Sequence, residues 1–261
     1  MKINVVEIIT DTNIGGAGKV LLTRLKKLDV ERFSVSVVIP CGSELREELN
    51  ELECEVYEMD GCKDVSFDLF EIAPLVRFLR ELSPDVVNCH GCLSARIAAY
   101  IARVPVRIYT RHCAFSINPA LAHFPIKNIN RTMTRLLNTK IISVAYAAFE
   151  NLIEMGIDPG QIEVIINGVL PIRKYNENEK KNARKMLGIK EDAFVCGICA
   201  RLEDCKGIDT LLRAAKQLSD EKKDCFFVIL GKGSKEEELK WLARSLGITQ
   251  RVKFCGFIDD I

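Results

Sequence analysis

Val195-Cys-Gly-Ile-Cys-Ala-Arg201-Leu-Glu-Asp-Cys-Lys206-Gly207 is the most informative stretch of this sequence. The apolar run 194–199 has the length of a buried strand, and an amphipathic helical segment begins after Gly207. A loop with two cations between a strand and a helix N-terminus can hold a phosphate group. Arginine binds two oxygens, lysine adds a point charge, and the free helix N–H groups add partial positive charge. The alternative is that Arg201 and Lys206 are solvated loop charges, which are common between strands and helices.

Apolar strands alternate with amphipathic helical segments on both sides of this stretch. Before it, the expected strands are Lys2–Ile9, Ser34–Pro40, Cys54–Met59, Val86–Cys89, Val106–Thr110, Lys140–Val144 and Ile162–Ile166. Helical periodicity covers about 17–28, 44–52, 67–82, 93–103, 126–138 and 146–156. This alternation predicts a parallel sheet covered on both faces, with ligands at the carboxyl ends of its strands.

A second, shorter series of the same kind begins after a polar segment. Its expected elements are strands Phe194–Cys199, Cys225–Leu230 and Arg251–Phe254, with helices over 207–219 and 235–246. We therefore expect an α/β chain with a complete Rossmann-type domain over 1–170, a linker with the start of a helix over 171–185, and half of a second Rossmann-type domain over 186–261.

The segment Ala200-Arg201-Leu202-Glu203-Asp204-Cys205-Lys206-Gly207 resembles the donor-binding loop of family 4 glycosyltransferases, which have the two-domain GT-B fold. Their pattern is G-R-L-x-x-x-K-G, and the one departure is Ala200 in place of the first glycine. The resemblance covers essentially the whole chain. It implies transfer of a hexosyl or related group from a nucleotide-diphosphate sugar to an acceptor, with retained configuration and no cofactor. It also implies a role in making cell-envelope polysaccharide.

The resemblance also assigns roles to residues outside this loop. Gly15-Gly16-Ala17-Gly18-Lys19 matches the family's double-glycine loop, whereas a Walker A loop is excluded because Val20 follows the lysine. His112 matches the histidine of a Thr-x-His segment that lies against the transferred sugar, and Arg201 and Lys206 would stabilise the departing diphosphate. His123 is left unassigned. Donor or acceptor binding is assigned to Gly15, Gly16, His90, Asn167, Gly207, Gly231 and Gly233.

The family's pair of glutamates, seven residues apart, has no counterpart after Phe254. We expect this chain to be truncated within the second domain and to be inactive by itself, and an exposed sheet edge left there could support self-association. Two alternatives to a glycosyltransferase stay open. One is a non-catalytic remnant that holds an acceptor or a membrane, and the other is a nucleotide-sugar epimerase of the same fold.

Composition limits the other functional classes. The chain has 261 residues, 48% of them hydrophobic, and a net charge of +1, so no overall field attracts polyanions. Its 11 cysteines are scattered through expected strands and loops, which is typical of reduced thiols in a cytoplasmic protein. Cys196 and Cys199 lie in an expected strand, where residues three apart point to opposite faces. Cys89 and Cys92 have no second ligand pair at a zinc-finger spacing, so no metal site is expected. Residues 1–10 are expected to form a strand and no signal peptide.

One segment departs from this balance of charge. Between Asp85 and Glu150 there is no acidic residue, and the local charge is +8. Lys127, Arg131 and Arg135 recur every four residues on one side of an expected helix after Pro125. A solvated helix face is one interpretation, but such faces usually mix signs. We therefore expect contact with anionic lipid or a phosphate-bearing, lipid-linked acceptor at the inner face of the membrane. Nucleic acid is not expected, because no aromatic residues interleave the charges.

Overall fold

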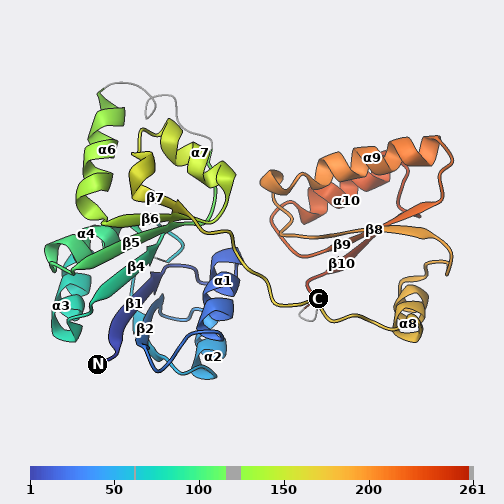
Figure 1. The fold of residues 1–261 in the computed structure, drawn as a ribbon. Helices are drawn as coiled ribbons and strands as arrows, with labels where there is room; N and C mark the ends of the chain where they lie inside the picture. Colours follow the sequence, from blue (N-terminus) through green and yellow to red (C-terminus); the bar gives the residue numbers. More distant parts are fainter. Residues whose placement is uncertain (62, 116–124, 259–261) are drawn as a thin grey trace. The chain divides into compact units, whose positions relative to one another are not determined.

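The computed structural model describes residues 1–61, 63–115 and 125–258. The chain divides into two compact units, Met1–Pro171 and Ile172–Ile261 (Figure 1). Each unit contains one parallel β-sheet with helices packed on it, and each is described by itself below.

The first unit is built on a seven-stranded sheet with the order β3-β2-β1-β4-β5-β6-β7, in which every neighbouring pair is parallel. From β1 the chain first adds strands on one side and then, from β4 onward, on the other. In doubly wound sheets, ligands bind at the point where this strand order reverses. The strands are β1 (Ile3–Ile9), β2 (Phe33–Pro40), β3 (Glu55–Met59), β4 (Val86–His90), β5 (Val106–Arg111), β6 (Lys140–Ser143) and β7 (Ile162–Val164).

Helices cover both faces of this sheet, because the strands alternate apolar side chains between the two sides. Leu21, Leu22 and Leu25 of α1 pack with α2 on one face, and Leu75 and Leu79 of α3 pack with α4 on the other. The helices of this unit in the described residues are α1 (Gly16–Leu25), α2 (Leu45–Asn50), α3 (Ile72–Leu82), α4 (Leu93–Ile101), α6 (Ile126–Leu137) and α7 (Tyr146–Glu154).

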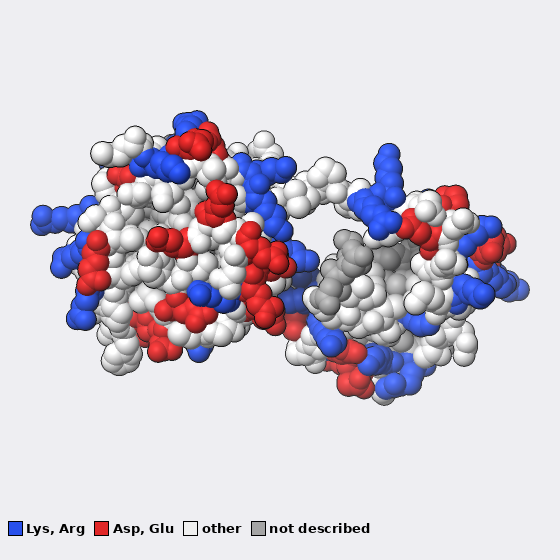
Figure 2. Space-filling view, turned by 90° about the horizontal axis from the view of Figure 1, so that it is seen from below, with Lys and Arg blue, Asp and Glu red and all other residues white. Residues whose placement is uncertain are grey.

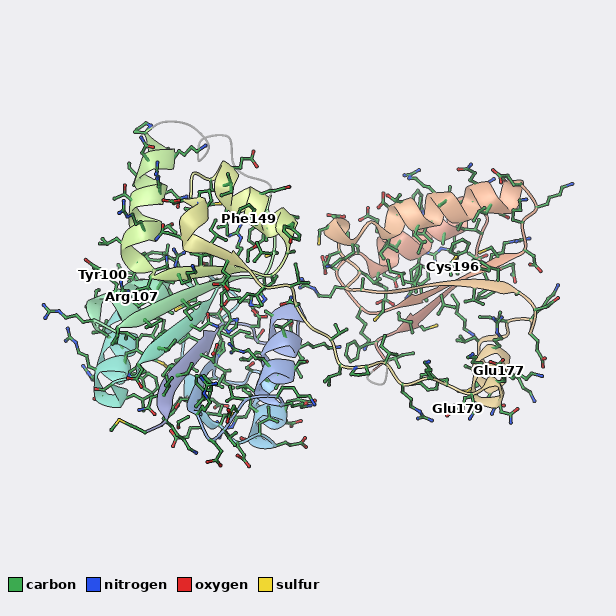
Figure 3. All side chains as sticks on the ribbon, viewed as in Figure 1. Tyr100, Arg107, Phe149, Glu177, Glu179 and Cys196 are labelled. Atoms are coloured by element: carbon green, nitrogen blue, oxygen red, sulfur yellow. The ribbon has the colours of Figure 1, made fainter. Side chains whose placement is uncertain are left out.

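The second unit has a three-stranded parallel sheet with the order β10-β9-β8. Its elements are α8 (Glu177–Leu187), β8 (Phe194–Cys199), α9 (Ile208–Asp220), β9 (Cys225–Leu230), α10 (Glu236–Ser245) and β10 (Val252–Gly256). Helix α8, which carries Glu177 and Glu179 (Figure 3), begins with a capping box in which Asn176 and Glu179 bond each other's backbone N–H groups. Figure 3 also marks Cys196 on β8, whose sulfur lies 3.7 Å from that of Cys225.

The predicted α/β class and both parallel sheets are confirmed, and the strands β8 and β9 match their expected bounds. The largest difference is helix α3, which was expected from residue 67 and begins at Ile72. Residues before it form a turn, because the Asp68 carboxylate accepts the N–H of Phe70 at 2.9 Å and the Asp68 N–H bonds Ser94 Oγ at 2.7 Å. Helix α8 also occupies much of the polar segment expected to contain the linker.

Strand β8 is an edge strand, since within the described residues it pairs only with β9. Phe194 on this strand is 68% exposed. We predict that the amides of β8 exchange hydrogen faster than those of the central strand β1 in a dilute monomer, because half of them face no partner strand. Native-state hydrogen exchange measures this. Equal protection of the two strands in the dilute monomer would contradict it, and protection of β8 that rises with concentration would indicate pairing with a second copy.

Candidate active site

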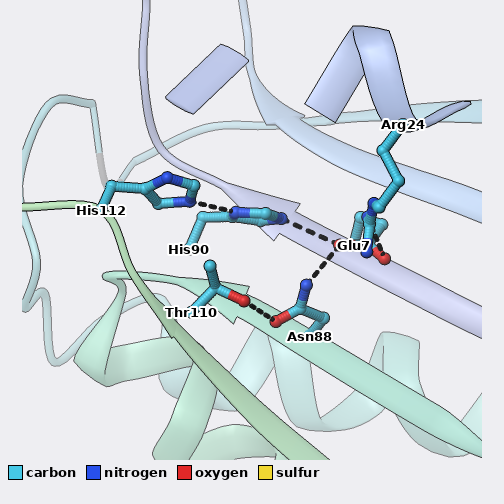
Figure 4. A network of polar contacts seen from close by, with 6 residues as sticks. All are labelled: Glu7, Arg24, Asn88, His90, Thr110 and His112. Carbon is cyan, nitrogen blue, oxygen red and sulfur yellow. Dashed lines mark hydrogen bonds and ion pairs between the residues drawn. The ribbon is translucent and has the colours of Figure 1, made fainter. Parts of the chain in front are cut away.

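Polar side chains from three adjacent strands meet at the carboxyl end of the first sheet (Figure 4). The register pairs Glu7 of β1 with Asn88 of β4, and His90 of β4 with Thr110 of β5. Because side chains alternate along a strand, residues two apart share a face, and His112 continues the face of Thr110. The five side chains therefore lie on one face of the sheet.

The Glu7 carboxylate is buried in the middle of this group, with 2% of the residue exposed. It accepts hydrogen bonds from Asn88 Nδ2 at 2.9 Å and His90 Nε2 at 2.8 Å, and it pairs with Arg24 of α1 at 2.5 Å. Burial alone would raise the pKa of Glu7, but the positive charge of Arg24 and the contact with His90 outweigh it and lower the pKa from 4.5 to about 2. Glu7 is therefore ionised at neutral pH.

The two histidines extend this arrangement toward the end of the sheet. His90 Nδ1 lies 2.7 Å from His112 Nε2, and the two rings are nearly parallel, with an angle of 23°. Burial, followed by the neighbouring His90 and Arg24, lowers the pKa of His112 from 6.5 to about 4. His112 is consequently neutral at neutral pH. Its Nδ1 is the buried side-chain nitrogen or oxygen atom that lacks a hydrogen-bond partner among the residues described.

Asn88 and Thr110 fix the orientation of this group. Asn88 donates to Glu7 through its amide nitrogen and accepts from Thr110 Oγ1 at 2.8 Å through its oxygen, so the amide has one orientation. The sequence pattern predicted the two histidines as site residues but not Glu7, Asn88, Thr110 and Arg24. A carboxylate inside the apolar first strand was the available signal, because a buried charge requires partners.

The double-glycine loop lies at the start of α1, which follows β1. Gly15 is the N-cap residue with an extended backbone, φ −83° and ψ −171°. A Cβ added at Gly16 would meet no atom within 4 Å, and one at Gly15 would meet only the Asp11 and Asn13 side chains at 3.5 and 3.7 Å. The backbone angles do not require a glycine at either position. The absence of a side chain instead leaves open space in which a ligand could approach the backbone closely.

The loop between β8 and α9 in the second unit is held by two glycines of the neighbouring loop. A Cβ at Gly231, where φ is +132°, would lie 2.0 Å from the carbonyl oxygen of Ala200, and one at Gly233 would lie 2.3 Å from that of Leu202. Glu203 adds hydrogen bonds from the N–H and the hydroxyl of Ser234, at 2.9 and 2.8 Å. Packing therefore explains Gly231 and Gly233, and their assignment to donor binding stays a prediction.

Arg201 and Lys206 extend from this fixed loop into solvent. Both residues are exposed, and neither forms a hydrogen bond or an ion pair through its side chain with any residue that the structure describes. Gly207 has φ +64°, a left-handed conformation that favours glycine, and it begins α9. Asn167 is exposed in the segment after β7. The loop thus presents two cations without a direct side-chain partner among the described residues, next to a helix N-terminus.

Helix α6 carries the three predicted surface cations. Arg131 and Arg135 are exposed, and Lys127 is half-buried with its aliphatic stem close to Gly156. The helix also exposes an apolar stripe at helical spacing. Its members, with their exposed fractions, are Ile126 (40%), Ile129 (56%), Met133 (44%) and Leu136 (51%). By contrast, the face of the molecule seen in Figure 2 mixes acidic and basic side chains.

Three other arginines of the basic segment bond internal groups of the first unit. Arg96 is buried and donates to Asn138 at 3.1 Å. Arg107, beside Tyr100 (Figure 3), donates to backbone carbonyls at 2.8 and 3.0 Å, and Arg111 donates to Asn151 at 2.8 Å. These arginines join β5 and α4 to neighbouring elements and are not available to an external anion.

His123 lies outside the described residues. Within the described ranges, no group of three or more histidine, cysteine, aspartate or glutamate side chains is arranged to hold a metal ion. In the same residues, no helix has the length and hydropathy of a membrane span.

Two parallel Rossmann-type sheets, with histidines at one and a cationic loop at the other, define the architecture of a GT-B glycosyltransferase. The model of Glycosyltransferase Family 4 matches residues 14–171, and that of Glycosyl transferases group 1 matches residues 179–261. Because the first match covers more than half of the chain, this chain belongs to glycosyltransferase family 4.

Individual proteins agree with this assignment. The chain is 26% identical to an uncharacterized glycosyltransferase of Methanocaldococcus jannaschii, over 67% of the chain and 47% of that protein. It is 29% identical to the putative glycosyltransferase EpsD of Bacillus subtilis, over 68% of the chain and 49% of that protein. The chain thus spans about half the length of these relatives. The structure of Anabaena HepE with UDP and glucose superposes with a TM-score of 0.79 and 21% identity, over 99% of this chain and 70% of that one.

The lowered pKa of Glu7 predicts a pH dependence of stability. Because its folded-state pKa is about 2 and its ordinary value 4.5, ionised Glu7 stabilises the fold above pH 4.5, and on the order of 3 kcal/mol is lost as the pH falls through this window. Urea unfolding at pH values on both sides of the window measures the loss. The Glu7→Gln variant should show little of this pH-dependent loss of stability. The control variant Glu163→Gln, which replaces an exposed side chain of β7, should show the full loss. An equal loss in Glu7→Gln and wild type would contradict the assignment.

Proposed function

We propose that the protein transfers a sugar from a nucleotide-diphosphate donor to an acceptor, with retention of configuration at the anomeric carbon. The donor would lose its diphosphate through a state with oxocarbenium character. In this proposal Arg201 and Lys206 stabilise the negative charge that develops on the leaving diphosphate, which is electrostatic catalysis without a required metal. His112, His90 and the Gly15–Gly16 backbone would contact the sugar or the acceptor.

The observation that carries this proposal is the fixed loop with two free cations. Packing of Gly231 and Gly233 against Ala200 and Leu202 holds the backbone, so the two cations need little reorganisation to meet a diphosphate. The N-terminus of α9, which follows at once, adds partial positive charge. The complexes of HepE with UDP and with UDP-glucose support a nucleotide-sugar donor for a chain of the same fold.

Removal of either loop cation tests this assignment. We predict that Arg201→Ala or Lys206→Ala in the full-length gene product lowers the rate of sugar transfer by about two to four powers of ten, as for loss of one charge stabiliser. Folding should be little affected, since both side chains extend from an exposed loop. Lys185→Ala on the exposed side of α8 is the matched control and should transfer at the wild-type rate. Both loop variants within about threefold of wild type would exclude the diphosphate role.

A non-catalytic remnant that binds an acceptor or a membrane is the alternative. It predicts no turnover of any nucleotide sugar by the full-length gene product, although binding to the first unit would persist. An epimerase, the third candidate, would change the sugar of the donor without an acceptor. Analysis of both products, the donor sugar and the glycosylated acceptor, separates all three.

We also propose that helix α6 lies on an anionic membrane surface, at the inner face of the membrane where a lipid-linked acceptor would be presented. The specific observation is the combination of exposed cations with the exposed stripe of Ile129, Met133 and Leu136. A helix that binds in the plane of a membrane has this composition, because its apolar side enters the acyl boundary while its cations meet the head groups.

Replacing Lys127, Arg131 and Arg135 together by glutamine tests this surface. Each cation near an anionic bilayer contributes about 1 kcal/mol, so binding to vesicles with phosphatidylserine should weaken by about two powers of ten at low salt. The matched control replaces Lys180, Lys181 and Lys185 of α8 by glutamine and should bind like wild type. Co-sedimentation over a salt series measures the effect. Equal sedimentation of wild type and the α6 variant, or no preference for anionic over neutral vesicles, would contradict membrane binding.

A further inference from the structure

Four non-glycine residues in the described parts of the chain have a left-handed backbone, and three of them follow helices. Ser83, Arg103 and Lys222 come at the ends of α3, α4 and α9, where a left-handed residue commonly terminates a helix. Asp64, with φ +54°, lies instead in the segment between β3 and α3. A strained residue of this kind persists only where its surroundings fix it, and such residues concentrate at functional sites.

Asp64 is bound to the segment that joins β1 to α1, residues 10–15. Its backbone N–H donates to the carbonyl oxygen of Thr10 at 2.9 Å. Its carboxylate accepts the N–H of Thr12 at 3.0 Å through one oxygen and the hydroxyl of Thr12 through the other. Residues 10–15 have left the sheet and have no ladder partners, so Asp64 supplies hydrogen bonds that a neighbouring strand would otherwise give.

A second residue, Glu44, holds the same segment from the loop between β2 and α2. The Glu44 N–H donates to the carbonyl oxygen of Thr12 at 2.9 Å, and its carboxylate accepts the N–H of Ile14 at 3.3 Å. Thr12 is therefore held on both sides, by Asp64 at its N–H and hydroxyl and by Glu44 at its carbonyl group. Contacts from two crossover loops fix one conformation of residues 10–15.

This anchoring leaves Gly15 and Gly16 open. A Cβ placed at either glycine would have no atom of Glu44 or Asp64 within 4 Å. Helix α1 begins there with no side-chain cap among the described residues and no acidic residue in its first turn. The segment is thus fixed at Thr12 and Ile14, while the backbone of the two glycines stays accessible to a ligand.

We propose that Asp64 is a positioning residue, which holds Thr12 and thereby keeps Gly15 and Gly16 in the conformation that binds substrate. This inference rests on the proposed contact of the Gly15–Gly16 backbone with the sugar or the acceptor. A segment that is already fixed in its bound conformation loses little conformational freedom on binding, so substrate binds more tightly. Where only a fraction of the molecules has the competent conformation, the apparent affinity falls by that fraction. Loss of the Asp64 contacts should therefore weaken binding and leave the chemical step unchanged.

Two substitutions at position 64 separate the role of the side chain from that of the backbone. Asp64→Gly adopts the left-handed conformation without strain but removes both side-chain contacts with Thr12. Asp64→Asn also tolerates this conformation, and its amide can accept from the Thr12 N–H and donate to the Thr12 hydroxyl. Lys222→Gly is the matched control, because it makes the same backbone change at φ +56° in the second unit.

The first test measures the segment directly in the 261-residue chain. Exchange of the Thr12 amide hydrogen, followed in ¹H–¹⁵N spectra, should be about tenfold faster in Asp64→Gly than in wild type, the order expected for loss of exposed hydrogen bonds. Asp64→Asn and Lys222→Gly should exchange like wild type, and the midpoint of urea unfolding should change little in all three variants. Unchanged exchange of the Thr12 amide in Asp64→Gly would overturn the proposal.

Kinetics of the full-length gene product supply the second test. Asp64→Gly should raise the KM of the substrate that contacts the glycines, donor or acceptor, by about tenfold and leave kcat unchanged, because bound substrate restores the competent conformation. Asp64→Asn and Lys222→Gly should keep the wild-type KM for both substrates. Unchanged KM values in an active Asp64→Gly variant, or a fall in kcat together with the unfolding midpoint, would overturn the positioning role alone. Absence of transfer by wild type would instead overturn the proposed function, and this role with it.

Discussion

The buried carboxylate of Glu7 is the interaction on which the first unit depends. An ionised carboxylate removed from water costs several kcal/mol unless its oxygens are paired and hydrogen-bonded. Its partners come from different elements, Arg24 from α1 and Asn88 and His90 from β4. Satisfying this charge therefore fixes α1 against the sheet, sets the register of β1 and β4, and aligns the histidines at the end of the sheet.

In the second unit, a different physical constraint fixes the loop between β8 and α9. There the backbone is held by close approach of two loops, which only glycine permits at positions 231 and 233. The backbone N–H groups of Ala200 and Leu202 also bond the carbonyls of Leu230 and Lys232, both at 3.0 Å. The side chains of Arg201 and Lys206 are thus not used to build the loop. A substitution that adds a Cβ at either glycine would displace both cations indirectly.

The strands, the helices and single residues at strand ends could be predicted from the sequence. Strands repeat every 2 residues and helices every 3.6, and both periods can be read from neighbouring residues alone. The sequence was not sufficient for contacts across strands. Glu7 and Asn88 are 81 residues apart, and Glu7 looked like an interruption of an apolar run. The count of charges in the basic segment could not separate internal from exposed arginines for the same reason, because Arg96 and Arg107 bond groups brought near them only by folding. Local pattern identifies strands and helices, and register identifies the partners of a buried charge.

Charge distinguishes what the two units can bind. In the first unit, Glu7 and Arg24 pair with each other, His112 is neutral at neutral pH because burial lowers its pKa to about 4, and its buried Nδ1 has no hydrogen-bond partner among the residues described. A neutral group of this kind suits an uncharged polar group better than an anion, because it offers no positive charge of its own. In the second unit, the two free cations suit an anion and offer nothing specific to a hydroxyl. Each unit by itself is therefore suited to a different chemical group, the first to an uncharged polar group and the second to an anion.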